Sequence, residues 1–138
     1  MRPAVDELPV SQPPRTALPR LLIVDDDRTT VRLLKTLLEL DGFEVSISPR
    51  GADVIPLAQQ VKPDLILMDY HLSDMQGIDV VVALRAMAEF ATTPIVVASG
   101  LNVEREALEA GASKFLIKPF DPENLQTLFT SLIENTKA

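Results

Sequence analysis

One short segment of the sequence holds side chains that could support acid–base, metal or nucleophilic chemistry. From Leu65 to Asp79 it reads LILMDYHLSDMQGID, with Asp69 directly after four apolar residues and His71, the only histidine of the chain, two positions later. A histidine beside a carboxylate could form an acid–base pair or bind a metal, and an aspartate alone could act as a nucleophile. The segment by itself leaves these three interpretations open.

Other reactive side chains also follow short apolar runs directly. They comprise three acids, a hydroxyl and an ammonium, namely Asp25, Asp26, Asp27, Ser99 and Lys118. Carboxylates that converge repel one another, and their pKa values rise unless a cation neutralises them. Oxygen ligands from few protein groups suit Mg²⁺, which also bridges to phosphates. The set therefore fits phosphoryl transfer to Asp69, with Ser99 and Lys118 contacting the phosphoryl oxygens.

Apolar runs and helical stripes alternate along the chain from residue 20 onward. We expect five strands, at Leu21–Val24, Phe43–Ser48, Leu65–Met68, Pro94–Ala98 and Phe115–Ile117. Each is followed by a helix, over about 27–40, 52–61, 78–87, 103–110 and from Pro122 onward. Five such units in succession predict a doubly wound α/β fold, with a parallel sheet and helices on both faces. In these sheets function gathers at the carboxyl ends of the strands, where the reactive side chains stand.

Composition limits the class of protein. The 138 residues suffice for one domain at 20–138, preceded by a proline-rich segment at 1–19 that we expect to be a disordered tail. A net charge of −7 argues against direct nucleic-acid binding, and the lack of cysteine excludes disulfides and thiolate sites. The first residues lack the apolar region of a signal peptide, and no apolar run reaches membrane-spanning length. We therefore expect a cytoplasmic protein with no membrane partner.

Four segments in order resemble the receiver domain of two-component response regulators: LLIVDDD, LILMDYHLSDMQGID, PIVVASG and GASKFLIKPF. Each motif is common when taken singly, but all four at strand ends in this order are specific. The resemblance covers the chain from about Leu21 to the end of the last helix. It implies a flavodoxin-like (βα)5 fold whose five parallel strands lie in the order 2-1-3-4-5.

The resemblance implies a metal site at the acidic positions. Asp69 matches the phospho-acceptor, and Asp25 and Asp26 match an acidic pair. In the family the second acid of the pair binds Mg²⁺, or Mn²⁺ in its place, directly, and the first acts mostly through water. The backbone carbonyl of His71 takes the third protein ligand position. Asp27 is then left to cap the following helix.

The resemblance also implies phosphoryl-binding and switch positions. Ser99 matches the switch hydroxyl, Lys118 the lysine that pairs with the phosphoryl group, and Phe115 the switch aromatic. The Lys118–Pro119 peptide bond is expected to be cis. Purely structural roles are the alternatives, with Ser99 as a turn residue, Lys118 as a surface lysine and Phe115 as part of the core.

The side chain of His71 has a different expected role from its carbonyl. We expect the imidazole to line the mouth of the site, where it would obstruct or hydrogen-bond the water that hydrolyses an acyl phosphate. It would then affect the lifetime of the phosphoryl group without being essential.

Three features depart from the family's pattern. Ser73 stands where proline is usual, which predicts a less rigid turn after Asp69, and Gly100 replaces a small alanine and adds backbone freedom. Ser99 and Lys118 stand 19 positions apart, about one helical turn fewer than expected. The helix between them or the loop before it must be shorter, so a standard partner on that face is not assured.

These inferences predict a receiver that takes a phosphoryl group from a histidine kinase or a histidine phosphotransfer protein. It would catalyse only its own phosphorylation and dephosphorylation, and would otherwise not be an enzyme. Its output would pass through the fourth helix, fifth strand and fifth helix to a downstream protein, to a C-terminal output domain outside this chain, or to a second copy in a homodimer. Arg28, Arg32 and Lys35 are candidates to meet the phosphoryl donor.

Two other classes of protein use part of the same set of residues. An aspartate-nucleophile phosphatase needs a second aspartate two residues after the nucleophile, where this chain has His71, and a cap domain for which the chain has no room. A pseudo-receiver would bind partners without being phosphorylated. The complete set of acids, Ser99 and Lys118 argues against it.

Overall fold

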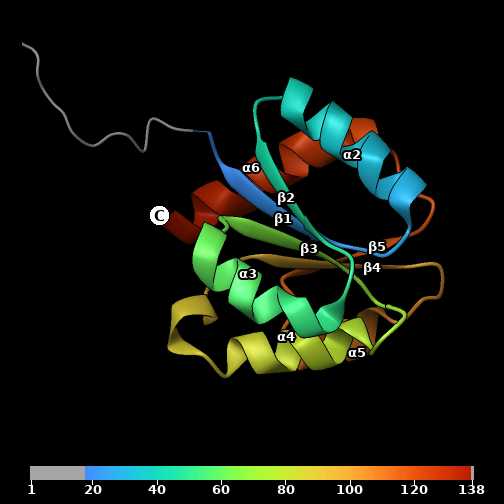
Figure 1. The fold of residues 1–138 in the computed structure, drawn as a ribbon, viewed down its shortest axis with the longest axis vertical. Helices are drawn as coiled ribbons and strands as arrows, with labels where there is room; N and C mark the ends of the chain where they lie inside the picture. Colours follow the sequence, from blue (N-terminus) through green and yellow to red (C-terminus); the bar gives the residue numbers. More distant parts are fainter. Residues whose placement is uncertain (1–17, 138) are drawn as a thin grey trace, which may run out of the picture.

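Five parallel strands form one sheet between two layers of helices in the computed structural model, which describes residues 18–137 (Figure 1). The strands are β1 (Arg20–Val24), β2 (Glu44–Ser48), β3 (Leu65–Asp69), β4 (Ile95–Ser99) and β5 (Lys114–Ile117). Their order is β2-β1-β3-β4-β5, which confirms the predicted doubly wound, flavodoxin-like topology. The tail predicted at 1–19 lies, as far as residue 17, outside the described residues.

The helices lie close to their predicted positions. They are α2 (Arg28–Leu40), α3 (Val54–Val61), α4 (Gly77–Arg85), α5 (Glu104–Ala110) and α6 (Leu125–Lys137), with 3-10 turns η3 (Gly51–Asp53), η4 (Ala88–Phe90) and η5 (Pro122–Asn124). The helix predicted over 52–61 begins as a 3-10 turn, and Pro56 lies in the first turn of α3, where its missing N–H breaks no helical hydrogen bond. Within residues 18–137, none of these helices has the length and hydropathy to cross a membrane.

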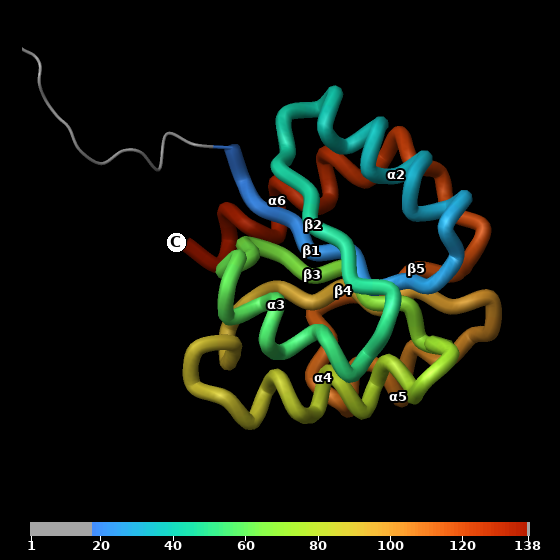
Figure 2. The backbone as a smooth tube through the Cα atoms, in the orientation of Figure 1, coloured from blue at the N-terminus to red at the C-terminus, as the bar shows by residue number. Residues whose placement is uncertain are grey.

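The sheet is buried on both faces, which explains why its central strands are wholly apolar. Leu22 and Val24 of β1 pack with α3, α4 and α5, whereas Leu21 and Ile23 pack on the other face with α2 and α6 (Figure 2). All four side chains are at most 1% exposed. The strands are therefore fixed from both sides, and so are the positions of their ends.

The parallel register brings the strand ends that carry reactive side chains to one edge of the sheet. Asp69, the last residue of β3, is level with Ala98 of β4, and Ser99 is level with Ile117 of β5. The next residue, Lys118, donates its backbone N–H to the carbonyl of Ser99 at 2.8 Å. This edge is the one at which sequence reasoning places the site.

The helix between Ser99 and Lys118 is short. α5 has seven residues, the fewest of the α-helices within the described part of the chain, and ends at Gly111, whose φ is +118°. Arg85, at the end of α4, donates hydrogen bonds to the carbonyls of Gly111, Phe90 and Thr93. One guanidinium thus fixes the end of the short helix against its neighbour.

Candidate functional site

Three carboxylates converge at the carboxyl edge of the sheet. Asp25 and Asp26 follow β1 and Asp69 ends β3, and each supplies one carboxylate oxygen to a group in which all the oxygens lie within 4.8 Å of one another. Asp25 is 6% exposed, so part of this charge is withdrawn from water. The predicted acidic residues are therefore brought together, in an arrangement that like charges oppose unless a cation is close by.

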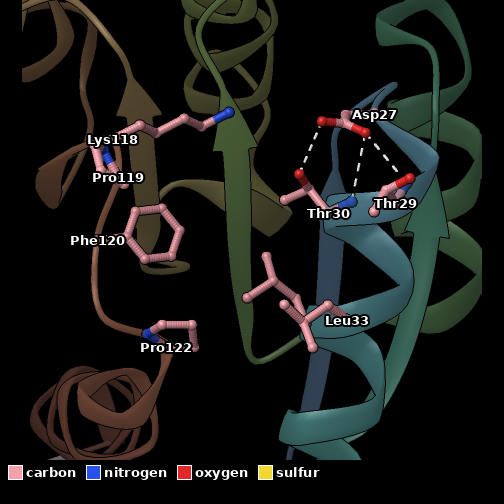
Figure 3. Close-up of a pocket in the computed structure, with 9 residues that line it drawn as sticks. Asp27, Thr29, Thr30, Leu33, Lys118, Pro119, Phe120 and Pro122 are labelled. Atoms are coloured by element: carbon pink, nitrogen blue, oxygen red, sulfur yellow. Dashed lines mark hydrogen bonds between the residues drawn. The ribbon is translucent and has the colours of Figure 1, made fainter.

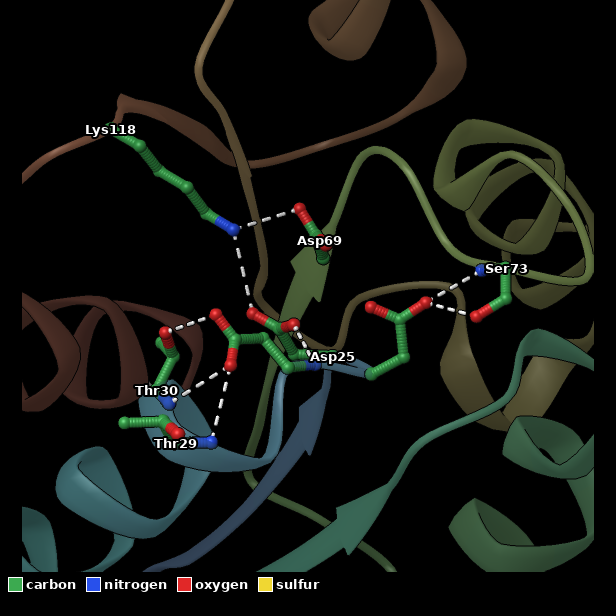
Figure 4. A network of polar contacts seen from close by, with 8 residues as sticks. Asp25, Thr29, Thr30, Asp69, Ser73 and Lys118 are labelled. Carbon is green, nitrogen blue, oxygen red and sulfur yellow. Dashed lines mark hydrogen bonds and ion pairs between the residues drawn. The ribbon is translucent and has the colours of Figure 1, made fainter.

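Lys118 supplies positive charge to this cluster. Its ammonium lies between two of the acids, 3.0 Å from Oδ1 of Asp69 and 3.4 Å from Oδ2 of Asp25 (Figure 4). Burial alone would lower the pKa of Lys118, but the hydrogen bond to Asp69 and the charge of Asp25 outweigh it and hold the pKa above its ordinary value. The ammonium stays charged. The Lys118–Pro119 bond that follows is cis, as the resemblance implies.

The surroundings of Asp69 disfavour its charged form and raise the pKa of its carboxyl. Burial raises its pKa and the hydrogen bond from Lys118 lowers it, but the charges of Asp25 and Asp26 add to the rise. The net pKa lies above the ordinary value for an aspartate. One ammonium therefore does not fully balance the three carboxylates.

Asp27 takes no part in the cluster. Its carboxylate accepts hydrogen bonds from the backbone N–H groups of Thr29 and Thr30 and from the Thr30 hydroxyl, which lowers the pKa of Asp27. It thus caps α2, as predicted. Its own backbone N–H donates to Oδ1 of Asp25 at 2.9 Å, so the cap also orients the first acid of the pair.

The turn after Asp69 is closed by its own backbone. Gly77 N–H donates to the carbonyl of Tyr70 at 2.6 Å, and Leu72 N–H donates to the carbonyl of Met75 at 3.2 Å. Neither of these two bonds uses the carbonyl of His71. The imidazole of His71 is exposed and meets the ring of Tyr70 edge-on, with centroids 4.5 Å apart.

Two residues of this turn have contacts that sequence reasoning missed. Ser73 donates both its backbone N–H, at 2.7 Å, and its hydroxyl to Oδ2 of Asp26. Asp74 accepts the backbone N–H groups of Gly51 and Ala52 at 2.9 and 3.0 Å, which lowers the pKa of Asp74. The turn is therefore tied to β1 on one side and to the start of η3 on the other, although Ser73 in place of proline had predicted a looser loop.

The candidate switch residues lie on one face of the sheet. Ser99 is 1% exposed, and its hydroxyl accepts the backbone N–H of Leu101 at 3.1 Å. Phe115 is paired with Val97, two residues before Ser99 on the neighbouring strand, and is 9% exposed. Because side chains alternate along a strand, the hydroxyl and the ring point to the same side.

A groove opens beside the site, between α2 and the loop that joins β5 to α6 (Figure 3). Its volume is about 490 Å³. The lining residues are Asp27, Thr29, Thr30, Leu33, Leu34, Lys118, Pro119, Phe120 and Pro122. Leu33 is 53% exposed, so the groove offers apolar surface within reach of the ammonium of Lys118.

Sequence comparison assigns the chain to a known family. The family model for the response regulator receiver domain matches residues 21–130, and the chain belongs to this family. In sequence, the chain is 41% identical over 103 residues to the transcriptional regulatory protein PrrA of Mycobacterium leprae. The match covers 74% of this chain and 44% of PrrA, so the chain spans less than half the length of this relative.

Solved structures agree with the family assignment. A crystal structure of a response regulator from Chloroflexus aurantiacus superposes with a TM-score of 0.80 at 29% identity, covering 85% of this chain and 98% of that one. The chemotaxis protein CheY4 of Vibrio cholerae gives 0.79 at 28% identity, covering 84% and 99%. The receiver fold predicted from the sequence is thereby confirmed.

The first prediction concerns Gly77, where the chain passes close to the acceptor strand. A Cβ at this position would overlap the carbonyl oxygen of Asp69 and lie 3.1 Å from Cγ of Met68. We expect Gly77→Ala to lower the free energy of unfolding by about 2–4 kcal/mol, because the backbone must shift. Gly100→Ala is the matched control, since a Cβ there meets nothing within 4 Å. Urea unfolding measures both; equal stabilities would contradict the close approach.

The second prediction concerns the charge of Asp69. An acid whose pKa is raised on folding destabilises the folded state above its ordinary pKa, and this loss develops as the pH rises through the raised value. Asp69→Asn should therefore stabilise the metal-free protein by about 1 kcal/mol at about pH 7, and flatten the fall in stability from about pH 4 upward.

Urea unfolding in a chelating buffer measures this effect, with Glu134→Gln on the exposed side of α6 as control. A destabilised Asp69→Asn protein would show that the ion pair with Lys118 outweighs burial and repulsion.

Proposed function

We propose that this chain is a phospho-accepting receiver domain, spanning residues 20–138, in which Asp69 takes a phosphoryl group from a phosphohistidine. The observation that carries the proposal is the position of Asp69 at a buried strand end, within a cluster of three carboxylates and 3.0 Å from the ammonium of Lys118. A carboxylate so placed can attack phosphorus, while the ammonium is already within contact distance of an incoming anion.

The donor set supports Mg²⁺, or Mn²⁺, as the cation of this site. It consists of the carboxylate oxygens of Asp25, Asp26 and Asp69, to which the resemblance adds the backbone carbonyl of His71. Hard oxygen ligands in small number suit an ion that keeps part of its water shell. Asp26, Asp69 and the His71 carbonyl would hold the ion, and Asp25 would act mostly through water. When bound, the cation neutralises charge on the carboxylates and on the phosphoryl oxygens.

The protein's own residues carry the transfer. An oxygen of Asp69 forms a bond to phosphorus as the bond from phosphorus to the donor imidazole nitrogen breaks, and the electron pair remains on that nitrogen. Lys118 moves from the Asp69 carboxylate to a phosphoryl oxygen. Asp25, held by the N–H of Asp27 and by Lys118, keeps its orientation throughout.

The signal would leave the site through Ser99 and Phe115. The Ser99 hydroxyl would exchange its present donor, the N–H of Leu101, for a role as donor to a phosphoryl oxygen. This movement would vacate space on the face that Phe115 shares and let its ring move toward the position that Ser99 leaves. Leu108 of α5 and Ile117 of β5 are exposed large apolar residues of the surface formed by α5, β5 and α6, and Leu101 is exposed in the loop before α5. That surface would meet a downstream protein, an output domain or a second copy of the chain.

The phosphoryl donor would approach across α2. Arg28, Arg32 and Lys35 line a hollow that also contains Asp25 and Asp26, and the groove on the opposite side of α2 carries Leu33 beside Lys118. A helix bearing the phosphohistidine could lay its apolar side in this groove. A histidine kinase or a histidine phosphotransfer protein fits this surface.

The remaining candidate functions have less support. An aspartate-nucleophile phosphatase needs an acid two residues after the nucleophile, and His71 occupies that position. A pseudo-receiver has no need for the arrangement of Lys118 between Asp25 and Asp69.

The third prediction tests acceptance of the phosphoryl group. Incubation with acetyl phosphate and Mg²⁺ should add one phosphoryl group to the wild-type protein and none to Asp69→Ala, as read by intact mass. Asp79→Ala, which removes an exposed acid ten positions later, is the matched control and should be labelled normally. Turnover to inorganic phosphate with many substrates would indicate a phosphatase, and lack of any adduct would indicate a pseudo-receiver.

The fourth prediction concerns the lifetime of the adduct. His71 is exposed and its ring meets that of Tyr70 edge-on. In the proposed function the imidazole would line the mouth of the site and obstruct or bind the attacking water. We expect His71→Ala and His71→Asn to change the dephosphorylation rate by about threefold to tenfold, with phosphorylation retained. The decay of the labelled protein, followed by mass, measures this rate. An unchanged rate in both variants would contradict the assigned role.

A further inference from the structure

Asp26 is held through one of its two oxygens. Both donors of Ser73, the backbone N–H and the hydroxyl, converge on Oδ2 of Asp26 from a position 47 residues away in the sequence. A backbone N–H is offered by any residue except proline, whereas the second donor requires a serine or threonine. The pair of bonds fixes both the rotation of the carboxylate and which oxygen is engaged.

The turn that presents these donors is itself fixed. Two backbone hydrogen bonds close it from within, Gly77 to Tyr70 and Leu72 to Met75. Asp74, the residue after Ser73, holds the N–H groups that start η3. Ser73 is therefore presented to Asp26 by a turn that hydrogen bonds anchor on both sides.

A carboxylate that has one oxygen occupied by hydrogen bonds binds cations of different size with different affinity. Ca²⁺ takes about six to eight oxygen ligands at about 2.3–2.6 Å and often binds a carboxylate through both oxygens. Mg²⁺ demands near-octahedral geometry at about 2.0–2.1 Å and takes one oxygen from each carboxylate. Two hydrogen bonds on Oδ2 leave Oδ1 of Asp26 for a cation and oppose two-oxygen binding.

We propose that Ser73 is a positioning residue that restricts Asp26 to one-oxygen coordination and thereby favours Mg²⁺ over Ca²⁺. The proposal rests on the metal site assigned under the proposed function, and deepens it by naming a determinant of its selectivity. Groups that hydrogen-bond to metal ligands change metal affinity by about 10–100-fold. The effect of Ser73 falls mainly on the ratio of the two affinities, because removing its donors gives Ca²⁺ a second oxygen that Mg²⁺ does not use.

The test is calorimetric titration of the full chain in two separate experiments, one with MgCl₂ and one with CaCl₂. No phosphoryl donor is present in either. We expect the ratio of the Kd for Ca²⁺ to the Kd for Mg²⁺ to fall about tenfold in Ser73→Pro, which removes both donors, and less in Ser73→Ala, which removes the hydroxyl. Ser73→Thr keeps both donors and should retain the wild-type ratio. Ser131→Ala removes a serine hydroxyl at an exposed position of α6, away from the site, and is the matched control.

A second readout follows Ser73 directly. Its amide N–H should remain protected from hydrogen exchange when Mg²⁺ binds, because Oδ2 stays engaged, and should lose protection only in saturating Ca²⁺. An unchanged or increased ratio in both Ser73→Ala and Ser73→Pro would overturn the proposal, as would loss of protection with Mg²⁺. A wild-type protein that binds neither cation would overturn the metal site itself. Acceptance of phosphoryl groups from acetyl phosphate is measured separately, so the two failures are distinguishable.

Discussion

Repulsion among carboxylates at one edge of the sheet is the constraint on which the rest of the site depends. Asp25, Asp26 and Asp69 offer oxygens within 4.8 Å of one another, and Lys118 supplies the nearest positive charge within the described residues. In a partly buried setting such a group is unfavourable: burial raises the pKa of Asp69, and the charges of Asp25 and Asp26 add to that rise. Added positive charge would relieve this repulsion, which is the physical basis of the cation site and of the phosphoryl acceptor that we propose.

The fold holds the three carboxylates together despite their repulsion, because the strands that carry them cannot move apart. The central strands are buried on both faces, and the strand ends inherit that rigidity. Neighbouring turns then fix each acid separately: the N–H of Asp27 orients Asp25, Ser73 orients Asp26, and the tight passage at Gly77 fixes the backbone of Asp69. The site is thus organised before any ligand binds, which is the condition for efficient electrostatic stabilisation.

Sequence patterns predicted the parts of this design that depend on periodicity and chain order. Apolar runs placed the strands, and the residue after each run placed the strand-end acids and Lys118 at a common edge. The hydrogen bonds from Ser73 to Asp26, and from Gly51 and Ala52 to Asp74, had no such signal, because they join irregular turns that are far apart in the sequence. The role of Gly77 had no such signal either, because its close approach to Asp69 emerges only from packing.

The most direct test of this account is a crystal structure of the protein with Mg²⁺ and trifluoroberyllate, an analogue of the phosphoryl group. The account predicts trifluoroberyllate on the carboxylate of Asp69, with the Lys118 ammonium and the Ser99 hydroxyl contacting its fluorines and the Ser99–Leu101 hydrogen bond broken. Trifluoroberyllate bound at another residue, or a Ser99 hydroxyl still paired with Leu101 beside an occupied Asp69, would contradict it.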